Sequence, residues 1–351
     1  YFDEFSPAMP FFLPRGTFIM NKLTNYMREK YNKYGYQEVI TPQIFSSKLW
    51  DLSGHSSHFK DNMFFTENED NKMGIKPMNC PSHYLLFRSR LHSYKDLPIR
   101  YAGFSTCFRR EAGTYGKDTT GIFRVHQFDK VEMFSFCNPE KSEEEHEFIL
   151  SVEEELLQSL EIPYRVVDVC AGDLGASAAK KYDIEAWIPS QNTYREVTSC
   201  SNTTSFQARR LNIRAKSEGE TSILHTLNGT AIAVGRILIA LIENNQTEDG
   251  KVEFSDKVAE IIGVKSHVLR FWEKKFSSIN PKKSLNGRRY YSSEDIEILL
   301  MIKKLLYEKG FTIKGAVSII DKKSQKNIKN TAYSVNIKLT KSINLIQQGL
   351  N

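Results

Sequence analysis

The spacing of apolar and polar residues changes several times along the first third of this 351-residue chain. Between residues 17 and 34, apolar side chains recur at every third or fourth position, which predicts an amphipathic helix. Residues 36–42 are rich in β-branched and aromatic side chains and end at a proline, so we expect a short strand there. Strands are also predicted at 98–108 and 122–136, around a polar loop at 110–121, because the second segment partly alternates apolar and polar residues.

Residues 140–160 form the next predicted helix, which is acidic and amphipathic. Ser142 and Glu145 have the spacing of a capping box at its start. Residues 223–243 are almost entirely apolar and predict one long helix. Between these helices we expect strands at 164–169, 185–189 and 194–199 and a short helix near 176–181. This succession indicates an α+β fold, an antiparallel sheet of about six or more strands with flanking helices.

A change in composition divides the chain. Residues 244–250 are polar, and we place the domain boundary there. Residues 252–351 contain 19 Lys and Arg against 9 Asp and Glu, a net charge of +10, whereas the rest of the chain carries −4. This asymmetry favours a basic module that faces nucleic acid, although a solvated lysine-rich tail gives the same balance. The expected divisions are a first domain at 1–246, a linker at 247–251, a second domain at 252–323 and a polar, disordered tail at 324–351.

The overall composition excludes several classes of protein. With 40% hydrophobic and 26% charged residues, the chain is typical of globular rather than disordered proteins. No apolar run approaches the ~20 residues of a membrane-spanning helix and no signal peptide is visible, so we expect a cytoplasmic protein without membrane association. Because the chain starts at Tyr1 rather than at a methionine, we expect it to be a fragment. Five widely spaced cysteines without a CxxC motif argue against a disulfide framework or a zinc ribbon.

Charged residues gather in the predicted strand pair around the polar loop. The forked guanidinium groups of Arg109 and Arg124 suit phosphate oxygens, and the ring of Phe128 suits stacking on a base. Glu111 and Glu132 are acceptors for an amine or an exocyclic amino group. Such a strand pair, joined by a glycine-rich loop, can hold a polyphosphate and a ribose-linked base above a flat sheet.

Three more residues extend this candidate nucleotide site. Glu196 and Ser199, on another predicted strand, are acceptors for a nucleotide or a bound Mg²⁺. Arg236 lies on the apolar segment, whose glycines permit close packing against a sheet. Any one of these residues alone is more often a surface strand charge, and it is the whole set that favours a nucleotide site.

Long strings in this region resemble class II aminoacyl-tRNA synthetases in their seryl version. Residues 108–113 (FRREAG) and 123–132 (FRVHQFDKVE) resemble motif 2 of that family. The strings at 196–202, 206–210 and 225–236 resemble its motif 3 region. The resemblance covers residues 104–246, and it implies activation of an amino acid with ATP followed by transfer to tRNA.

The same resemblance implies a role for each matching residue. Arg109 and Glu111 would bind the α-phosphate and the adenine amino group, Arg124 and Arg236 the β- and γ-phosphates, and Phe128 would stack on adenine. Arg109 and Arg236 would thereby be the catalytic residues. Glu196 and Ser199 would complete the ATP and Mg²⁺ site, Glu132 would receive the substrate ammonium, and Thr230 would lie on the serine side.

Residues 1–100 resemble a different member of this class, threonyl-tRNA synthetase. The strings include residues 9–16, 35–39 and 75–81, and the resemblance implies a homodimer formed through the segment that ends at Thr41-Pro42. Cys80 falls where threonyl enzymes use a cysteine, together with two histidines, to bind zinc. This chain has no histidine at either of the two matching positions, so Zn²⁺ is not expected. Cys80 is interpreted as a thiol that lines the amino-acid pocket.

Residues 252–323 resemble the winged helix–turn–helix domain of MerR-type transcription regulators, which is a small, all-α module. The resemblance rests on residues 254–273 and on the basic aromatic string at 287–291. It implies binding to double-stranded DNA that weakens steeply with salt. The implied DNA contacts are Lys265, Ser266, His267, Arg270, Arg288, Arg289 and Tyr290.

These resemblances leave alternatives open. Serine is the favoured amino acid because Glu132 and the motif 3 strings are of the seryl type, threonine is the second candidate, and a DNA-binding regulator that carries an inactive synthetase-like domain is the third. The seryl tRNA-binding coiled coil and the threonyl editing and anticodon-binding domains are not found, so charging of tRNA is a separate question. A natural fusion, a misassembled reading frame and an engineered chimera all fit three resemblances in series.

Overall fold

The computed structural model of the chain describes residues 1–68, 71–88, 91–112, 118, 121–217, 219–247, 252, 255, 271–283, 289–290 and 293–320. The chain forms two compact units, Tyr1–Asn245 and Gln246–Asn351. None of the helices in this described part combines the length and the apolar character that crossing a membrane demands.

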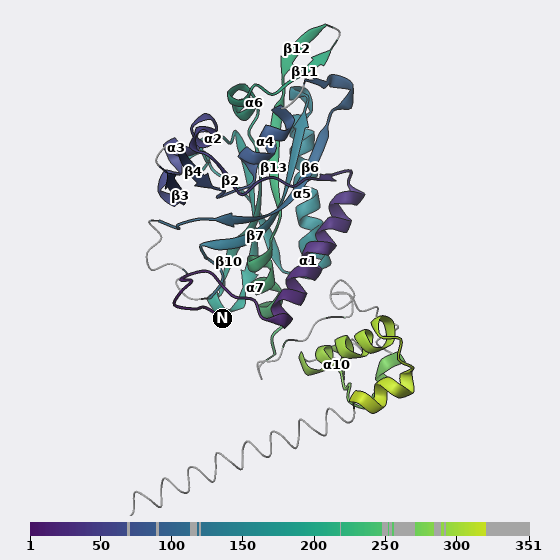
Figure 1. Ribbon diagram of the computed structural model, residues 1–351. Helices are drawn as coiled ribbons and strands as arrows, with labels where there is room; N and C mark the ends of the chain where they lie inside the picture. The colour runs from purple at the N-terminus through teal and green to yellow at the C-terminus, as the bar shows by residue number, and fades with distance from the viewer. Residues whose placement is uncertain are drawn as a thin grey trace, which may run out of the picture. The chain divides into compact units, whose positions relative to one another are not determined.

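A seven-stranded sheet forms the centre of the first unit (Figure 1). Only the edge strand β1 pairs in parallel, with β6, and every other pair is antiparallel. The predicted antiparallel sheet with flanking helices is therefore confirmed. In sheet order the strands are β1 (Gln37–Glu38), β6 (Ile99–Phe108), β7 (Gln127–Cys137), β13 (His225–Ala233), β10 (Thr193–Asn202), β9 (Lys180–Ile188) and β8 (Tyr164–Asp168).

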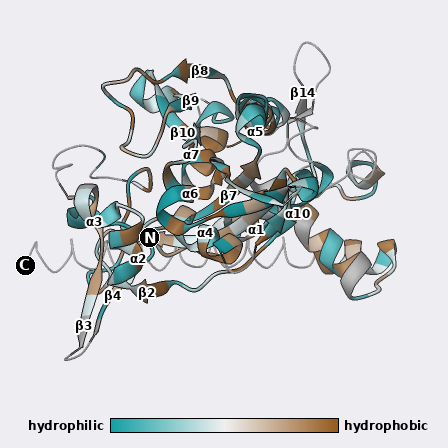
Figure 2. Cartoon of the chain, turned by 90° about the horizontal axis from the view of Figure 1, so that it is seen from above, coloured by the Kyte–Doolittle hydropathy of each residue, from teal (hydrophilic) through white to brown (hydrophobic). Residues whose placement is uncertain are grey.

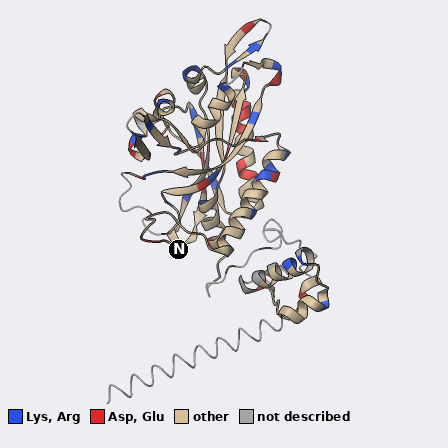
Figure 3. Ribbon diagram, viewed as in Figure 1, with Lys and Arg blue, Asp and Glu red and all other residues tan. Residues whose placement is uncertain are grey.

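Helix α5 (Ser142–Ser159) packs against the central strands β7, β10 and β13. Its apolar stripe, which includes Ile149, Leu156 and Leu157, is fully buried, while its first turn is acidic (Figure 3). Gly229 of β13 lies directly under this helix, and a Cβ atom there would come within 2.3 Å of Cγ2 of Ile149. The absence of a side chain at Gly229 is therefore what lets the helix approach the sheet so closely.

Two other helices border the sheet in the first unit. Helix α1 (Pro14–Lys33) confirms the helix predicted at 17–34, and it packs against helix α7 (Val234–Asn244). Helix α7 is strongly apolar, as Figure 2 shows by colour, and buries Val234, Ile237 and Leu241. It contacts strands β7 and β9, so its first turn lies beside the sheet.

The prediction of one long helix at 223–243 is wrong. Its first half is the strand β13, which is paired on both sides, with β7 and β10, and only residues from Val234 onward are helical. A strand that is buried on both faces lacks a regular alternation of apolar and polar residues, so its pattern cannot be told from that of a buried helix. The short helix expected near 176–181 is also wrong, because strand β9 begins at Lys180.

The capping box predicted at Ser142 and Glu145 does not form. A 3-10 turn, η3 (Pro139–Lys141), precedes helix α5, and the side chain of Asn138 caps that turn by accepting from the backbone N–H of Glu140. The Ser142 hydroxyl donates to the carbonyl of Pro139. Glu145 turns inward instead and forms a double hydrogen bond with Arg100, at 2.6 and 2.7 Å, because burying that guanidinium requires a carboxylate partner.

Shorter elements surround one end of the sheet, around a cluster of buried aromatic residues that includes Trp50, Tyr84, Phe134 and Phe136. The helical elements here are α2 (Ser47–Leu52), α3 (His55–His58), η1 (Lys60–Asn62), α4 (Cys80–Arg88), η2 (Tyr94–Asp96) and α6 (Phe206–Leu211), with η4 (Pro189–Gln191) between β9 and β10. The two small sheets are β2 (Ile44–Ser46), β4 (Asn71–Ile75) and β3 (Phe65–Asn68), and β12 (Glu220–Ile223), β11 (Arg214–Ser217) and β5 (His92–Ser93).

The second unit has a hydrophobic core of its own, which includes Trp272, Phe276, Leu299 and Ile302. Helix α10 (Ser293–Lys303) continues into a π-helical turn, η5 (Lys304–Glu308), which confirms the helix predicted at 293–309. A two-stranded hairpin pairs β14 (Lys282–Lys283) with β15 (Arg289–Tyr290), and β15 belongs to the predicted basic wing. The predicted DNA contacts Lys265, Ser266, His267, Arg270 and Arg288 lie outside the described residues.

Candidate active site

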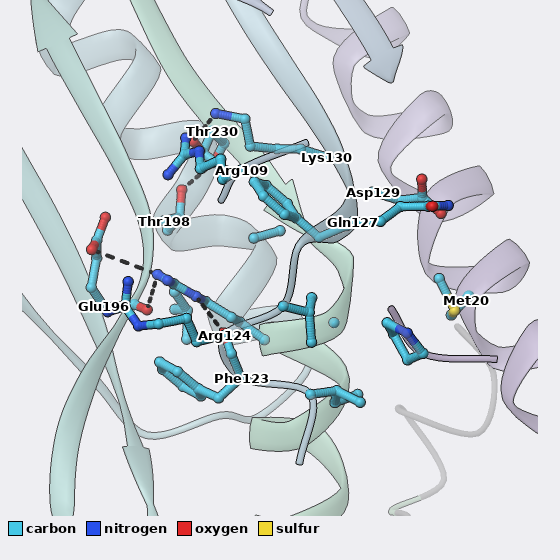
Figure 4. Close-up of a pocket in the computed structure, with 18 of the residues that line it drawn as sticks. Met20, Arg109, Phe123, Arg124, Gln127, Asp129, Lys130, Glu196, Thr198 and Thr230 are labelled. Carbon is cyan, nitrogen blue, oxygen red and sulfur yellow. Dashed lines mark hydrogen bonds and ion pairs between the residues drawn. The ribbon is translucent and has the colours of Figure 1, made fainter. Parts of the chain in front are cut away.

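A cavity of about 170 Å³ lies against strands β7, β10 and β13, the start of helix α7 and Arg109, which directly follows strand β6 (Figure 4). Pro10 and Phe12 of the N-terminal segment and Met20 of helix α1 close one side of it. Residues that are more than 100 positions apart in the sequence therefore share one wall. Eight of the residues predicted from the sequence line the cavity: Arg109, Glu111, Arg124, Phe128, Glu196, Ser199, Thr230 and Arg236.

Arg109 is fixed at the end of strand β6 by contacts on several sides. Its Nε donates to the carbonyl of Pro77 at 3.0 Å. Its guanidinium lies 5.2 Å from the centre of the Phe128 ring and 5.5 Å from that of Phe59. Because cation–π contacts of this kind hold a guanidinium in place without neutralising it, Arg109 keeps its charge available to an anion in the cavity.

Arg124 and Arg236 carry the other two guanidinium groups on this wall. Nη1 of Arg124 lies 2.7 Å from Oε2 of Glu111. Nη1 of Arg236 donates to the backbone carbonyl of Glu196 at 2.9 Å and lies 3.6 Å from the carboxylate of that residue. The two carboxylates, of Glu111 and Glu196, therefore balance part of the positive charge of the three arginines.

The surroundings of Arg236 disfavour its positive charge. Burial lowers the pKa of its guanidinium, and the nearby charges of Arg109 and Arg124 lower it further, while Glu196 acts in the opposite direction. Arg236 also lies in the first turn of helix α7, where the helix dipole is positive. Like charges placed together at such a position are stabilised by an anion, so this wall of the cavity is built to bind one.

Glu132 and Cys80 lie next to the cavity but do not line it. Glu132 is 1% exposed, and its carboxylate contacts Nζ of Lys130 at 2.8 Å, Nδ2 of Asn228 at 3.1 Å and the Cys80 thiol at 3.1 Å. Lys130 connects this cluster to the cavity, which it lines, and its Nζ lies 3.4 Å from Oγ1 of Thr230. The predicted amino-acid contacts thus form one connected group beside the predicted nucleotide contacts.

The ionisation of this inner cluster follows from its partners. Burial by itself raises the pKa of Glu132, but the adjacent Lys130 ammonium and the donated hydrogen bonds bring it below its usual value. Burial and the Glu132 charge raise the pKa of the Cys80 thiol well above its usual value. Cys80 is therefore a protonated thiol that donates to a carboxylate, not a thiolate ready to bind a metal.

The donor sets for metals differ between the two candidate ions. Glu196 and Ser199 both offer oxygen atoms to the cavity, which is the ligand type that Mg²⁺ prefers. Within the described residues, no group of three or more His, Cys, Asp and Glu side chains is arranged to hold a metal ion.

The sequence interpretation missed several residues of the site. Phe123 is buried against the cavity, and the guanidinium groups of Arg195 and Arg236 lie 4.2 and 4.8 Å from the centre of its ring. Lys130 and Asn228 hold Glu132, as described above. A lysine two positions before a glutamate on one strand was a usable signal, since residues at this spacing share a face. Asn228 offered no signal until β13 was known to be a strand.

Comparisons with known proteins identify the family of each part of the chain. The family model of the tRNA synthetase class II core domain (G, H, P, S and T) matches residues 62–245, and that of the MerR HTH family regulatory protein matches residues 255–323. The serine–tRNA ligase of Dictyoglomus thermophilum is 56% identical over 250 residues, which are 71% of this chain and 56% of that protein. That of Corynebacterium kroppenstedtii is 47% identical over 238 residues, 67% of this chain and 55% of that protein.

Among solved structures, the chain is similar to tRNA synthetases. The seryl-tRNA synthetase from Pyrococcus horikoshii complexed with ATP has a TM-score of 0.68 at 42% identity, over 74% of this chain and 58% of that one. The RNA binding domain of threonyl-tRNA synthetase from Cryptosporidium parvum has a TM-score of 0.62 at 26% identity, over 70% of each chain. The present chain thus spans little more than half the length of the serine–tRNA ligases it matches. The family model covers more than half of its residues, and the chain belongs to the class II tRNA synthetase core-domain family (G, H, P, S and T).

Proposed function

We propose that residues 1–246 form the catalytic domain of an aminoacyl-tRNA ligase, with serine as the favoured amino acid. The observation that carries the proposal is the convergence of Arg109, Arg124 and Arg236 with Phe128 on one cavity. Three guanidinium groups and an aromatic face in one small space match a polyphosphate joined to a base. The seryl-tRNA synthetase structures that the chain resembles, one complexed with ATP and one with AMP, support the same ligand.

The proposed reaction has two steps. A carboxylate oxygen of the amino acid attacks the α-phosphorus of ATP, the bond from that phosphorus to the bridging oxygen of the β-phosphate breaks, and pyrophosphate leaves with the electron pair. The oxygen of a terminal hydroxyl of tRNA then attacks the aminoacyl carbonyl, the bond from the carbonyl carbon to the phosphate oxygen breaks, and AMP leaves with the electron pair while the hydroxyl proton passes to its phosphate. Positioning and charge neutralisation provide most of the acceleration in phosphoryl-type transfers. Arginines that are held in place can provide both.

Each cavity residue has a place in this scheme. Arg109 would bind the α-phosphate, because its Nε is anchored on Pro77 while the rest of its guanidinium is open to the cavity. Arg124 and Arg236 would take the β- and γ-phosphates in place of their present carboxylate neighbours. Glu111 would then be released to accept from the adenine amino group, and Phe128 would stack on the base.

Glu196 and Ser199 would hold Mg²⁺ when ATP is bound, and the ion would add positive charge at the phosphates. Glu196 suits this role because its side chain is 45% exposed and its carboxylate lies 3.6 Å from Arg236, a looser contact than a tight ion pair. A divalent ion can therefore reach this carboxylate without breaking a buried interaction.

The amino acid would lie between Thr230 and Glu132. The substrate ammonium would be received by Glu132, which Lys130 and Asn228 hold as an ionised acceptor. Serine is favoured by the identity with serine–tRNA ligases. Threonine is the second candidate, since Cys80 lies at the end of the amino-acid cluster and the fold is also similar to that of threonyl-tRNA synthetase.

ATP–pyrophosphate exchange with each standard amino acid in turn tests this proposal. We expect exchange with serine and a loss of at least 100-fold in the Arg109→Ala variant, the size seen when a positioned transition-state donor is removed. Exchange with threonine alone would move the assignment to the second candidate. No exchange with any amino acid would refute the enzymatic proposal.

We propose a second function for residues 252–323, which is the binding of double-stranded DNA. The match to the MerR family and the net charge of +10 after residue 251 support it, as does the hairpin that carries Arg289 and Tyr290. Gel shifts at two salt concentrations test it, because phosphate contacts release counterions and make affinity salt-dependent. Affinity that neither salt nor the Arg288→Ala/Arg289→Ala variant changes would refute it.

The remaining assignments follow from these two functions. The proposed substrates are the amino acid, ATP and tRNA, and the proposed location is the cytoplasm, where all three are available. We also propose a homodimer formed through the segment that ends at Thr41-Pro42, next to the exposed side chains of Ile40 and Ile44. Sedimentation of the intact chain measures this directly, and a monomer at micromolar concentration would contradict it.

A further inference from the structure

A second ion pair adjoins the arginine wall of the cavity and has no part in the proposed reaction. Arg195 of strand β10 binds the carboxylate of Asp118 with both arms of its guanidinium, at 2.9 Å from Nη1 to Oδ1 and 2.5 Å from Nη2 to Oδ2. The Asp118 side chain is only 9% exposed. Parallel paired contacts of this kind are the strongest form of arginine–carboxylate interaction.

Asp118 also faces the arginines of the cavity. Its Oδ2 lies 3.7 Å from Nε of Arg124. Hydrogen bonding to Arg195 lowers the pKa of the Asp118 carboxyl, and the charges of Arg195, Arg124 and Arg236 add to that effect. Asp118 is therefore a permanently ionised carboxylate within the field of three guanidinium groups, of which two line the cavity.

The ring of Phe123 joins the two groups of arginines. The guanidinium of Arg195 lies 4.2 Å from the centre of this ring, and that of Arg236 lies 4.8 Å from it. Arg195 does not line the cavity, whereas Arg236 does. Asp118 thus lies between Arg195, which binds it in a forked contact, and the two arginines of the cavity. Arg124 contacts it loosely, and Arg236 acts on it only through its charge.

We propose that Arg195 is a positioning residue for the terminal phosphates of ATP, because it holds the Asp118 carboxylate in a forked pair and so limits its contact with Arg124 to a loose one at 3.7 Å. This inference rests on the proposed nucleotide site and adds a residue to it. Without the Arg195 fork, Asp118 would turn to the next nearest cation, Arg124, and an internal carboxylate would compete with the phosphates for the arginine wall. The competing partner is part of the chain, so its effective concentration is high.

The proposal makes a prediction about the phosphate end of the nucleotide alone. In Arg195→Gln, which keeps a stem to pack on Phe123, we expect affinity for ATP to fall about tenfold, equal to about 1.4 kcal/mol. Affinity for AMP should stay within about twofold, since AMP lacks the phosphates assigned to Arg124 and Arg236. A general loss of structure would weaken both ligands alike.

The decisive experiment combines this variant with Asp118→Asn. If Arg195 acts by restraining the Asp118 charge, removing that charge also removes the competition with the phosphates. Asp118→Asn/Arg195→Gln should then recover ATP affinity to within about twofold of the unmodified chain. Asp118→Asn alone should bind ATP at least as tightly as the unmodified chain. If the pair merely stabilises the local fold, the double variant will bind ATP as weakly as Arg195→Gln, and the inference is overturned.

A matched control is available on the same sheet. Arg165 of strand β8 binds Glu185 of β9 at 2.7 Å and lies 4.9 Å from the ring of Tyr194, which reproduces the chemistry of Arg195 away from the cavity. Arg165→Gln should change the affinity for neither nucleotide. Affinities are measured by calorimetry on the intact chain with ATP and AMP, and circular dichroism checks the fold of each variant.

The outcomes separate this inference from the proposed function. Failure of the unmodified chain to bind ATP would refute the nucleotide site, and the inference with it. Binding of ATP by the unmodified chain, with equal binding by Arg195→Gln or with no recovery in the double variant, would overturn only the role of Arg195.

Discussion

Substitution of Gly229 by alanine tests how closely helix α5 and the central sheet are packed. A Cβ atom at this position would lie 2.3 Å from Cγ2 of Ile149, 2.5 Å from Oε1 of Glu153 and 3.2 Å from Cβ of Cys200. Carbon atoms in contact normally lie about 3.5–4.0 Å apart, so the helix or the strand must move by about 1 Å. Both Ile149 and Glu153 are fully buried and cannot swing into solvent.

The expected cost follows from that displacement. Overpacking a well-packed interior by one methyl group costs about 1–3 kcal/mol, and for a unit of this size each kcal/mol lowers the melting temperature by about 2–4 °C. Because Asn228 and Thr230 flank Gly229, a shift of strand β13 also moves the proposed amino-acid contacts. We therefore expect a lower urea midpoint and a higher KM for the amino acid in Gly229→Ala.

Urea unfolding followed by tryptophan fluorescence measures the first effect, with Gly172→Ala as the control. A Cβ atom at Gly172 would meet no atom within 4 Å, and its φ lies outside the left-handed region. Gly172→Ala should therefore unfold within about 0.5 kcal/mol of the unmodified chain. If Gly229→Ala unfolds at the same urea concentration as this control, the close approach of α5 to β13 is not as described.

Two further predictions concern buried ionisable groups. Glu132→Gln leaves the Lys130 ammonium buried without its carboxylate, and we expect a loss of about 3–5 kcal/mol in the free energy of unfolding, whereas Glu185→Gln, whose partner Arg165 is exposed, should cost less than about 1 kcal/mol. Burial lowers the pKa of His83 to about 4, so the unfolded chain binds more protons between pH 6.5 and 4, and stability is lost as the pH falls through that range. From pH 7 to pH 5 the loss from His83 is about 2 kcal/mol, and the pH dependence of the free energy of unfolding, measured by urea titration, should shrink by that amount in His83→Gln; an unchanged dependence would contradict it.

Eight residues that line the cavity could be named from the sequence, because the chemistry of a nucleotide site depends on residue type and strand spacing. Arg109 and Arg124 flank the loop between two predicted strands, and antiparallel pairing brings both ends of such a loop to one place. Arg236 reached the same cavity although the prediction placed it in the middle of a long helix, not in the first turn of α7. The assignment of Arg236 to the cavity did not depend on the wrong element, because strand β13 and helix α7 follow each other without a loop.

The features that the sequence did not predict depend on contacts between distant side chains. Asp118 and Arg195 are 77 positions apart, and neither residue type nor spacing indicates that they form a pair. The capping box failed for the same reason. Glu145 has the spacing to cap its own helix, but a buried guanidinium at Arg100 competes for the carboxylate, and a double hydrogen bond to a charged partner is stronger than one to a backbone N–H.

Strand β6 spans the point at which the resemblance expected from the sequence changes from the threonyl to the seryl type. The match to the serine–tRNA ligase of Dictyoglomus thermophilum covers 250 residues, which is more than residues 104–246. The ten residues of β6 pair with β7 from Ile99 to Phe108 without a shift of register. The rings of Tyr84 and Phe87 from the first part pack on Phe134 and Phe136 from the second, and apolar packing of this kind tolerates exchange of the surrounding sequence.

The two parts of the proposed site differ in their contact with Cys80. Arg109, Arg124 and Arg236, which would bind the phosphates, line the cavity, and Cys80 does not. In the amino-acid cluster the Cys80 thiol donates to the Glu132 carboxylate. We therefore expect a substitution at Cys80 to alter the choice of amino acid while leaving the affinity for ATP unchanged in calorimetry.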